Sequence, residues 1–261
     1  YVKNIVTDWN WGTTPNRMPV WQVVIEKLVI TLKYNLVALV IYFIGGVTLG
    51  IVSAYYKNKI ADNLVSIFTM LFNSIPGFVL IFFLILVFAY GVRWFPAQEP
   101  FANADLARKL KGMVIPIIAL SVGPMGRIAQ LVRGELIESI NSQQYLLLRA
   151  KGLTKKQAFL RHGLKDSMVV LLPEIIPMLV FVINMSFVIE YTYNINGIAL
   201  LFVKSVISFG GEYNAVMINV PIAVTIGTLL YSIVLFFSLV SDMSLALLDP
   251  RIKIKSKKTE A

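Results

Sequence analysis

The sequence has no cysteine and only one histidine, His162. Without cysteine the chain can form no disulfide, no thiolate metal site and no cysteine nucleophile, and a single histidine cannot build a histidine-rich metal site. We therefore expect no bound metal in this chain.

Charged residues are also scarce. They make up 15% of the 261 residues, whereas 57% are hydrophobic, and the mean hydropathy is +0.74. A soluble globular domain of this composition would have too little polar surface to cover its core, so we expect an integral membrane protein. The 24 lysines and arginines outnumber the 14 acidic residues, but they cluster beside apolar segments. That pattern indicates topology signals and contact with the lipid bilayer, and no nucleic-acid binding.

Three catalytic motifs are missing as well. The chain has no GxxxxGKS/T phosphate loop, so we expect that it does not hydrolyse ATP itself. It also lacks the GxSxG nucleophile elbow and the HExxH zinc motif, either of which would support an intramembrane hydrolase. These absences predict a chain that is not an enzyme.

Apolar runs near the ~20 residues that a bilayer-spanning helix requires recur along the chain. We predict an all-α, polytopic membrane helix bundle over residues 23–247, with an extracytoplasmic or interfacial segment at 1–22 and a cytoplasmic tail at 248–261. The five predicted spans cover residues 35–55, 64–90, 113–131, 167–191 and 213–247. Five spans place the first residue outside and the last inside, which normally requires an earlier membrane helix. Since the first residue is Tyr and not Met, we expect that a leading segment is missing.

Prolines interrupt several of these spans. Pro76 and Gly77 predict a kink in the second span, and Pro116 with the following GPMGR run predicts a break in the third. The last span is expected to be interrupted by Pro221.

The segment between the third and fourth spans is strongly basic. Residues 149–165 carry six basic residues and no acidic one, which places this loop, at about 134–167, on the cytoplasmic side. Gly152 is a helix stop and Thr154 is an N-cap for a second helix, so the sequence predicts a short helical hairpin at the inner membrane surface. The alternative is that these cations only fix the topology.

The loop between the second and third spans, residues 91–112, is then placed outside. It carries four cations, Arg93, Arg108, Lys109 and Lys111, which run against the positive-inside rule. The external placement holds because the loops assigned to the cytoplasm are more basic.

Five polar residues lie in apolar surroundings, and such residues usually face a bundle interior or a cavity. They are candidates for a substrate pathway: Asn73, Ser74, Asn184, Ser186 and Glu190. The alternative is helix–helix hydrogen bonding or, for Glu190, a position at the outer interface.

The RAKGL run at 149–153, followed by RHGLKDS at 161–167, resembles the cytoplasmic signature loop of permease subunits in binding-protein-dependent ATP-binding-cassette (ABC) importers. Three further stretches fit the peptide branch of that family: SIPGF at 74–78, WFPA at 94–97 and LLDPRIK at 247–253. Together they resemble the B-type permease of oligopeptide or dipeptide systems. One departure is that leucines at 146–148 occupy the Glu-Ala-Ala positions of the general importer signature.

The resemblance implies a type I importer permease fold, usually of six spans, in a bacterial cytoplasmic membrane. It implies peptide import together with a second homologous permease, an extracytoplasmic binding protein and two ATP-binding subunits, which bind the ATP and Mg²⁺. The resemblance also implies that the signature loop seats in a cleft of an ATPase subunit. The residues thereby assigned to ATPase coupling are Arg149, Ala150, Lys151, Gly152, Leu153, Arg161 and His162.

Two alternatives stay open at this point. An ion-coupled secondary transporter or channel would use buried ionisable residues, for which Glu174, Glu190 and Asp242 are the main acidic candidates. A purely structural membrane scaffold is the third interpretation. Co-purification of ATPase subunits and passage of a substrate would separate the three.

Overall fold

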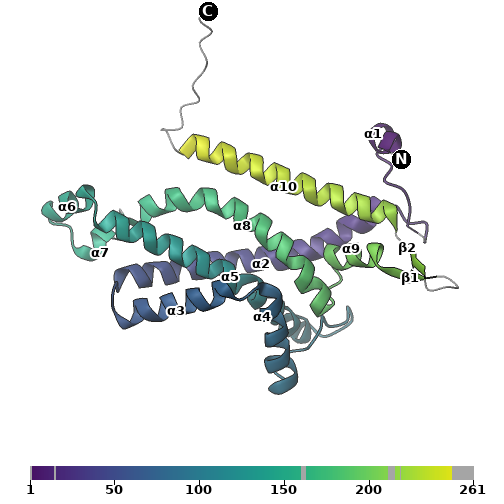
Figure 1. The fold of residues 1–261 in the computed structure, drawn as a ribbon, viewed down its shortest axis with the longest axis horizontal. Helices are drawn as coiled ribbons and strands as arrows, with labels where there is room; N and C mark the ends of the chain where they lie inside the picture. Colours follow the sequence, from purple (N-terminus) through teal and green to yellow (C-terminus); the bar gives the residue numbers. More distant parts are fainter. Residues whose placement is uncertain (1, 15, 160–162, 211–214, 218, 249–261) are drawn as a thin grey trace, which may run out of the picture.

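The computed structural model describes residues 2–14, 16–159, 163–210, 215–217 and 219–248, and this part of the chain is almost entirely helical. Four long helices follow the long axis of the molecule (Figure 1): α2, Val20–Tyr55; α5, Leu106–Ile140; α8, Leu164–Tyr193; and α10, Val220–Leu248. The shorter helices are α1 (Val2–Asp8), α3 (Ile60–Ser74), α4 (Gly77–Leu84), α6 (Gln143–Ala150), α7 (Lys155–Ala158) and α9 (Ile198–Val206). The π-helix η1 (Ile85–Gly91) extends α4, and the strands β1 (Ser208–Gly210) and β2 (Ala215–Met217) pair in antiparallel fashion.

The predicted helical membrane bundle is confirmed. Among the described residues, three helices are long and apolar enough to cross a bilayer, and two bent helix pairs raise the number to as many as five. The predicted cytoplasmic tail lies outside the described residues beyond Leu248.

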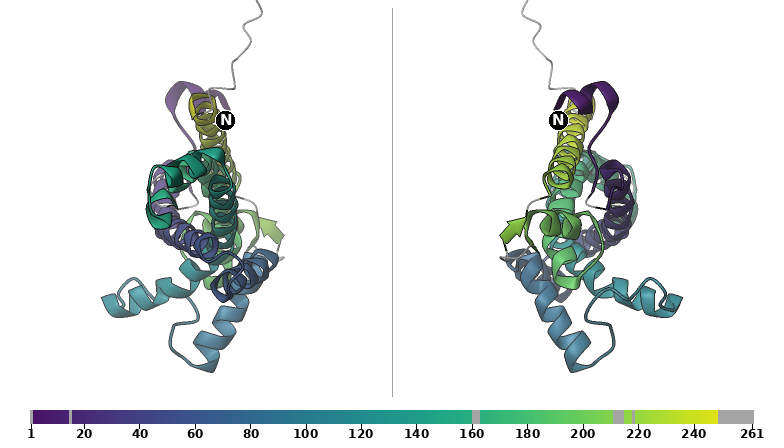
Figure 2. Two further views of the ribbon diagram at one scale, coloured as in Figure 1. Left: turned by 90° about the vertical axis from the view of Figure 1, so that its left-hand side faces the viewer. Right: turned by 90° about the vertical axis from the view of Figure 1, so that its right-hand side faces the viewer.

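The predicted interruptions are only partly right. The second span is fully broken at Ile75 and Pro76, because α3 and α4 meet at 102°. Figure 2 shows α4 projecting away from the long helices, on the side opposite α10. By contrast α5 continues through Pro116 and Pro124, so the predicted break in the third span is wrong. Pro116 and Pro124 are both buried in the bundle, and packing of this kind allows membrane helices to tolerate proline.

Three span boundaries also differ from the prediction. The first span joins its amphipathic approach in one continuous helix, α2. The last begins at Val220, after the β1–β2 hairpin, and Pro221 lies in its first turn, where a missing backbone N–H costs nothing. The α8–α9 pair turns at Asn194, which has the left-handed φ of 55°.

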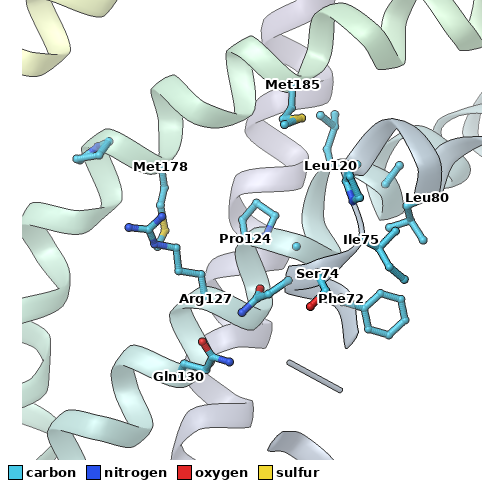
Figure 3. A pocket seen from close by; sticks show the side chains of 16 residues that line it. Phe72, Ser74, Ile75, Leu80, Leu120, Pro124, Arg127, Gln130, Met178 and Met185 are labelled. Atoms are coloured by element: carbon cyan, nitrogen blue, oxygen red, sulfur yellow. The ribbon is translucent and has the colours of Figure 1, made fainter. Parts of the chain in front are cut away.

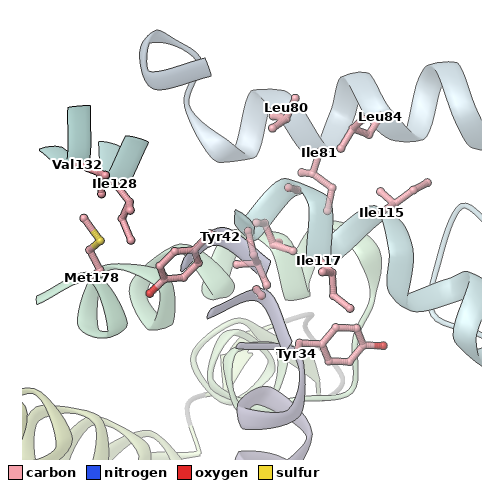
Figure 4. Packing of buried hydrophobic residues seen from close by; sticks show 14 of the residues in the cluster. Tyr34, Tyr42, Leu80, Ile81, Leu84, Ile115, Ile117, Ile128, Val132 and Met178 are labelled. Atoms are coloured by element: carbon pink, nitrogen blue, oxygen red, sulfur yellow. The ribbon is translucent and has the colours of Figure 1, made fainter. Parts of the chain in front are cut away.

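The closest helix contact is between α2 and α5. A Cβ atom added at Gly46 would lie 2.8 Å from the Met125 carbonyl oxygen, and one added at Gly50 would lie 2.8 Å from that of Ala129. The two glycines are four residues apart, so they form one small-residue face that lets two helix backbones touch, as in many membrane helix pairs. Buried side chains of α2, α4 and α5 continue this contact into the main core, which includes Tyr42 (Figure 4).

A carboxylate fixes the inner end of this helix pair. Asp62, only 2% exposed, accepts two hydrogen bonds from the Arg133 guanidinium, at 2.7 and 2.9 Å. It also accepts from the Ser53 hydroxyl at 2.5 Å and from the Asn58 backbone N–H at 2.9 Å. Asp62 therefore ties the ends of α2 and α3 to α5, and a bidentate pair of this kind fixes orientation as well as distance.

A second carboxylate fixes the outer end. Glu99, in the loop before α5, accepts from the Tyr34 hydroxyl of α2 at 3.0 Å and from the Asn196 backbone N–H at 2.8 Å. The Glu99 backbone N–H donates to the Tyr193 carbonyl oxygen at 2.9 Å. The loop after α4 is thereby held against α2 and the α8–α9 turn.

Replacing Gly50 by alanine tests the α2–α5 contact. The new methyl group would lie 2.6 Å from the Val132 Cβ atom, so the helices must move apart. We expect a loss of about 1–3 kcal/mol in the free energy of unfolding, as for other overpacked cores, visible as a lower Tm in detergent.

The matched control is Gly227→Ala in α10, where an added Cβ atom meets nothing within 4 Å. Alanine is the better helix former by ~1 kcal/mol, so this variant is expected to keep or raise the Tm. Equal Tm values for both variants would contradict the close packing of α2 and α5.

Candidate functional site

The hairpin predicted at the inner surface is present. Helix α6 is capped by Ser142, whose hydroxyl accepts from the Tyr145 backbone N–H at 3.2 Å. The helix stops at Gly152, which has a φ of 88°. The Gly152 N–H donates to the Arg149 carbonyl oxygen, and the Leu153 N–H donates to that of Leu148. This pair of bonds is a Schellman motif, in which glycine avoids the steric cost of positive φ.

Thr154 begins the second helix as predicted. Its hydroxyl accepts from the Gln157 backbone N–H at 3.3 Å, and the Gln157 side chain accepts from the Thr154 backbone N–H at 3.0 Å. This reciprocal arrangement is a capping box, which stabilises a helix start locally. Two short-range sequence signals therefore determine the shape of this loop.

The hairpin is held firmly on the bundle. Ala158 and Phe159 are fully buried, and the Phe159 ring meets the Tyr55 ring edge to face, with centroids 5.5 Å apart. The Lys155 ammonium lies 5.6 Å from the centroid of the Tyr55 ring. The hairpin therefore contacts the inner end of α2 through Tyr55.

The outer surface of the hairpin is both apolar and cationic. We name residues 146–153 the docking knob. Leu146 and Leu147 are 64% and 61% exposed, and Arg149, Ala150, Lys151 and Gly152 are exposed as well, whereas Leu153 is half-buried. Arg149 donates to the Leu153 carbonyl oxygen at 2.6 Å, which braces the knob across its turn. Arg161 and His162 lie outside the described residues.

The docking knob protrudes at one end of the long axis. The turn that joins α2 to α3 lies at the same end (Figure 1), so both basic segments predicted to be cytoplasmic are on one side. The loop before α5, predicted to be external, lies toward the other end with the α8–α9 turn. The described structure is therefore consistent with a single orientation in the bilayer.

A cavity of about 580 Å³ lies beside the break between α3 and α4 (Figure 3). Asn73 and Ser74 line it, as do Arg127 and Gln130 of α5 and Met178 and Met185 of α8. Prolines and glycines form much of the remaining wall. The cavity thus combines a few polar groups with adaptable apolar surface, a combination typical of small-molecule sites.

Of the five predicted pathway residues, only Asn73 and Ser74 reach this cavity. Asn184 donates to the Val180 carbonyl oxygen and Ser186 to that of Ile183. Glu190 is 1% exposed, and its Oε2 accepts from the Ala199 backbone N–H at 3.0 Å. Its carboxylate holds the start of α9 against α8, and a part for these three residues in transport stays a prediction.

Arg127 and Gln130 line the cavity, although the sequence pattern did not predict them as lining residues. The available signal was a cation inside an apolar span, immediately after the GPMG run. Within the described residues no group of three or more His, Cys, Asp or Glu side chains could hold a metal ion.

Comparison with known proteins assigns the chain to a family. Residues 46–254 match the family model described as "Binding-protein-dependent transport system inner membrane component". The chain is 30% identical over 257 residues to the dipeptide transport system permease protein DppB of Lactococcus lactis. The matched region covers 97% of this chain and 79% of that protein. The chain is also 31% identical over 224 residues to the oligopeptide transport system permease protein OppB of Salmonella typhimurium. This matched region covers 86% of this chain and 69% of that protein.

Solved structures support the same fold. An inward-facing structure of the MetNI methionine ABC transporter has a TM-score of 0.65 at 19% identity, over 88% of this chain and 97% of the other. A crystal structure described as an amino acid ABC transporter with histidines has a TM-score of 0.62 at 15% identity, over 85% of this chain and 92% of the other. The type I importer permease fold is thereby confirmed, and none of these proteins supports the ion-coupled alternative. The chain is a multi-pass protein of the bacterial inner membrane and belongs to the family of binding-protein-dependent transport system inner membrane components.

Proposed function

We propose that this chain is the permease subunit of an ABC importer that carries peptides across the bacterial inner membrane. The peptide assignment rests on the relatives, which are named as dipeptide and oligopeptide permeases. The single structural observation that carries the transport assignment is the docking knob, exposed at the end of the bundle and anchored through Phe159.

The docking knob is the contact to an ATP-hydrolysing subunit. Its exposed leucines suit an apolar cleft, and Arg149 and Lys151 suit carboxylates at the rim of that cleft. Two ATP-binding subunits, a second homologous permease and an extracytoplasmic binding protein complete the importer, and the ATP and Mg²⁺ belong to the ATP-binding subunits.

Coupling requires that ATP favours one arrangement of the bundle. To shift an equilibrium from 1:99 to 99:1, ATP must bind the favoured state better by about 5.5 kcal/mol. The contact of Phe159 with Tyr55 gives a route from the docking knob to α2, and the α2–α5 contact extends that route to the cavity wall.

The cavity beside the α3–α4 break forms part of the peptide path. Its amide groups from Asn73 and Gln130 can bind peptide backbone of any sequence, and its methionines adapt to different side chains. The single observation that favours this role is the 102° break, which opens the bundle at this point.

Gly152→Asp tests the docking knob. An added Cβ atom meets nothing within 4 Å in this chain, so a side chain can start here apart from the cost of positive φ, and it would stand in the proposed cleft. We expect membrane insertion to survive and peptide uptake in vesicles to fall at least tenfold, which corresponds to ~1.4 kcal/mol or more of lost coupling.

The matched control is Gly134→Asp on the exposed side of α5, where an added Cβ atom also meets nothing within 4 Å. This variant carries the same charge change on ordinary helical backbone, and it is expected to keep most of its uptake. Normal uptake by Gly152→Asp would count decisively against the docking role.

Gly123→Leu tests the cavity. An added Cβ atom at Gly123 has its nearest neighbour, the Phe72 carbonyl oxygen, at 3.8 Å, so a larger side chain can extend into the free volume. Peptide uptake is expected to fall severalfold while ATPase subunits still co-purify with the variant.

Gly134→Leu supplies the comparison, since it adds the same side chain to the same helix away from the cavity. If Gly123→Leu assembled normally and took up peptide as fast as Gly134→Leu, the cavity would not lie on the path.

A further inference from the structure

A second hollow lies at the outer end of the bundle. It has a volume of about 470 Å³ and is formed by α2, α9, the α8–α9 turn and the loop that leads into α5. Three lysines line it: Lys33 of α2, Lys109 of the first turn of α5, and Lys204 of α9. Helices far apart in the sequence therefore each contribute one lysine to the same wall.

The charges around this hollow are not balanced. Among the described residues that line it, Glu99 is the only carboxylate, so three lysines against one glutamate give this described lining a net charge of +2. Both oxygens of Glu99 already accept hydrogen bonds, one from Tyr34 and one from Asn196. Within the described part of the chain, none of the three lysines forms an ion pair.

Topology does not explain this gathering of cations. Lysines on the external side oppose the positive-inside bias. Lysines that only set the orientation of the chain in the bilayer would also not need to line the same hollow. The three side chains repel one another unless an anion lies between them. Their convergence is therefore explained by a ligand that carries negative charge.

The rest of the wall defines the kind of anion. Ile30, Met113 and Leu200 add apolar surface, while Asn194 and the side chain of Gln98 add amide groups. The volume falls in the ~300–1,000 Å³ range of small-molecule sites, which bind a ligand through apolar walls and a few placed polar groups. A carboxylate attached to an amino-acid residue suits this wall: the carboxylate suits the lysines, the backbone suits the amide groups, and the side chain suits the apolar surface.

We infer that this hollow binds the C-terminal carboxylate of the incoming peptide on the external side, before the peptide reaches the central cavity. This inference rests on the proposed peptide import. Linear peptides of different sequence share only their backbone and their two termini. Lys33, Lys109 and Lys204 select the negatively charged terminus, and the apolar wall accepts the last side chain whatever its identity.

The test compares free-acid and C-terminally amidated forms of a mixed library of short linear peptides. The complete importer, with its binding protein, is reconstituted in liposomes, and uptake of each form is measured by mass spectrometry. Replacement of Lys33, Lys109 and Lys204 by methionine is expected to lower the acid-to-amide uptake ratio about tenfold or more, because each lost contact is a charged hydrogen bond. The binding protein is the same in every sample, so its own preference cancels.

Lys111→Met is the matched control. Lys111 belongs to the same helix as Lys109, but it is exposed and does not line the hollow. Its replacement should therefore leave the acid-to-amide uptake ratio unchanged. Replacement of the three lysines by arginine keeps the charge and should keep the ratio. Lys204→Met alone alters one exposed side chain, so it should lower the ratio in a smaller step even if the triple methionine variant does not fold.

The inference is overturned if a folded methionine variant leaves the acid-to-amide ratio unchanged. Equal loss of both forms would assign the lysines to the binding protein's surface. A lysine-dependent effect that appears only in vesicles containing phosphatidylglycerol, and not in phosphatidylcholine alone, would assign them to lipid headgroups. If the wild-type importer took up neither form, the proposed function itself would fail, which is a separate result.

Discussion

The contact on which this structure depends is the direct packing of the α2 backbone on the α5 backbone at Gly46 and Gly50. At these glycines, backbone carbonyl oxygens of α5 and the side chains of Ile128 and Val132 lie directly against the α2 backbone, so the two helices pack closely. Asp62 fixes the inner end of the pair by its bidentate bond with Arg133, and Glu99 fixes the outer end through Tyr34. Burying a carboxylate is costly unless it is paired and hydrogen-bonded, and the buried Asp62 meets that requirement through Arg133, whereas the half-buried Glu99 is held by neutral donors.

The α2–α5 pair lies between two regions for which different roles are proposed, the docking knob and the cavity. At the inner end, the docking knob is joined to α2 by the contact of Phe159 with Tyr55. Nearer the middle, the α3–α4 break opens a cavity against the other side of α5 (Figure 3). If the docking knob contacts an ATPase subunit as proposed, packed helices connect that contact to the cavity wall. Packed cores transmit small shifts because they are close-packed and hard to compress.

Local signals made the docking knob predictable, and long-range contacts limited the rest. Gly152 and Thr154 specify a helix stop and a helix start from a few neighbouring residues, so the hairpin could be read from the sequence. Pro76 and Pro116 look alike in sequence, yet only the first lies at a break, because α5 stays helical through Pro116, which is buried in the bundle. The pairing of Asp62 with Arg133 spans 71 residues, and no periodicity in the sequence indicates it.

The central claim is that the docking knob lies on the cytoplasmic side and is covered by a separate ATPase subunit. Since the chain has no cysteine, Lys151→Cys introduces a single thiol at the exposed tip. Labelling of this thiol with a membrane-impermeant maleimide should occur in inside-out vesicles only, and it should be blocked when the ATPase subunits are present. Labelling from the external side, or labelling that the ATPase subunits leave unchanged, would contradict the account.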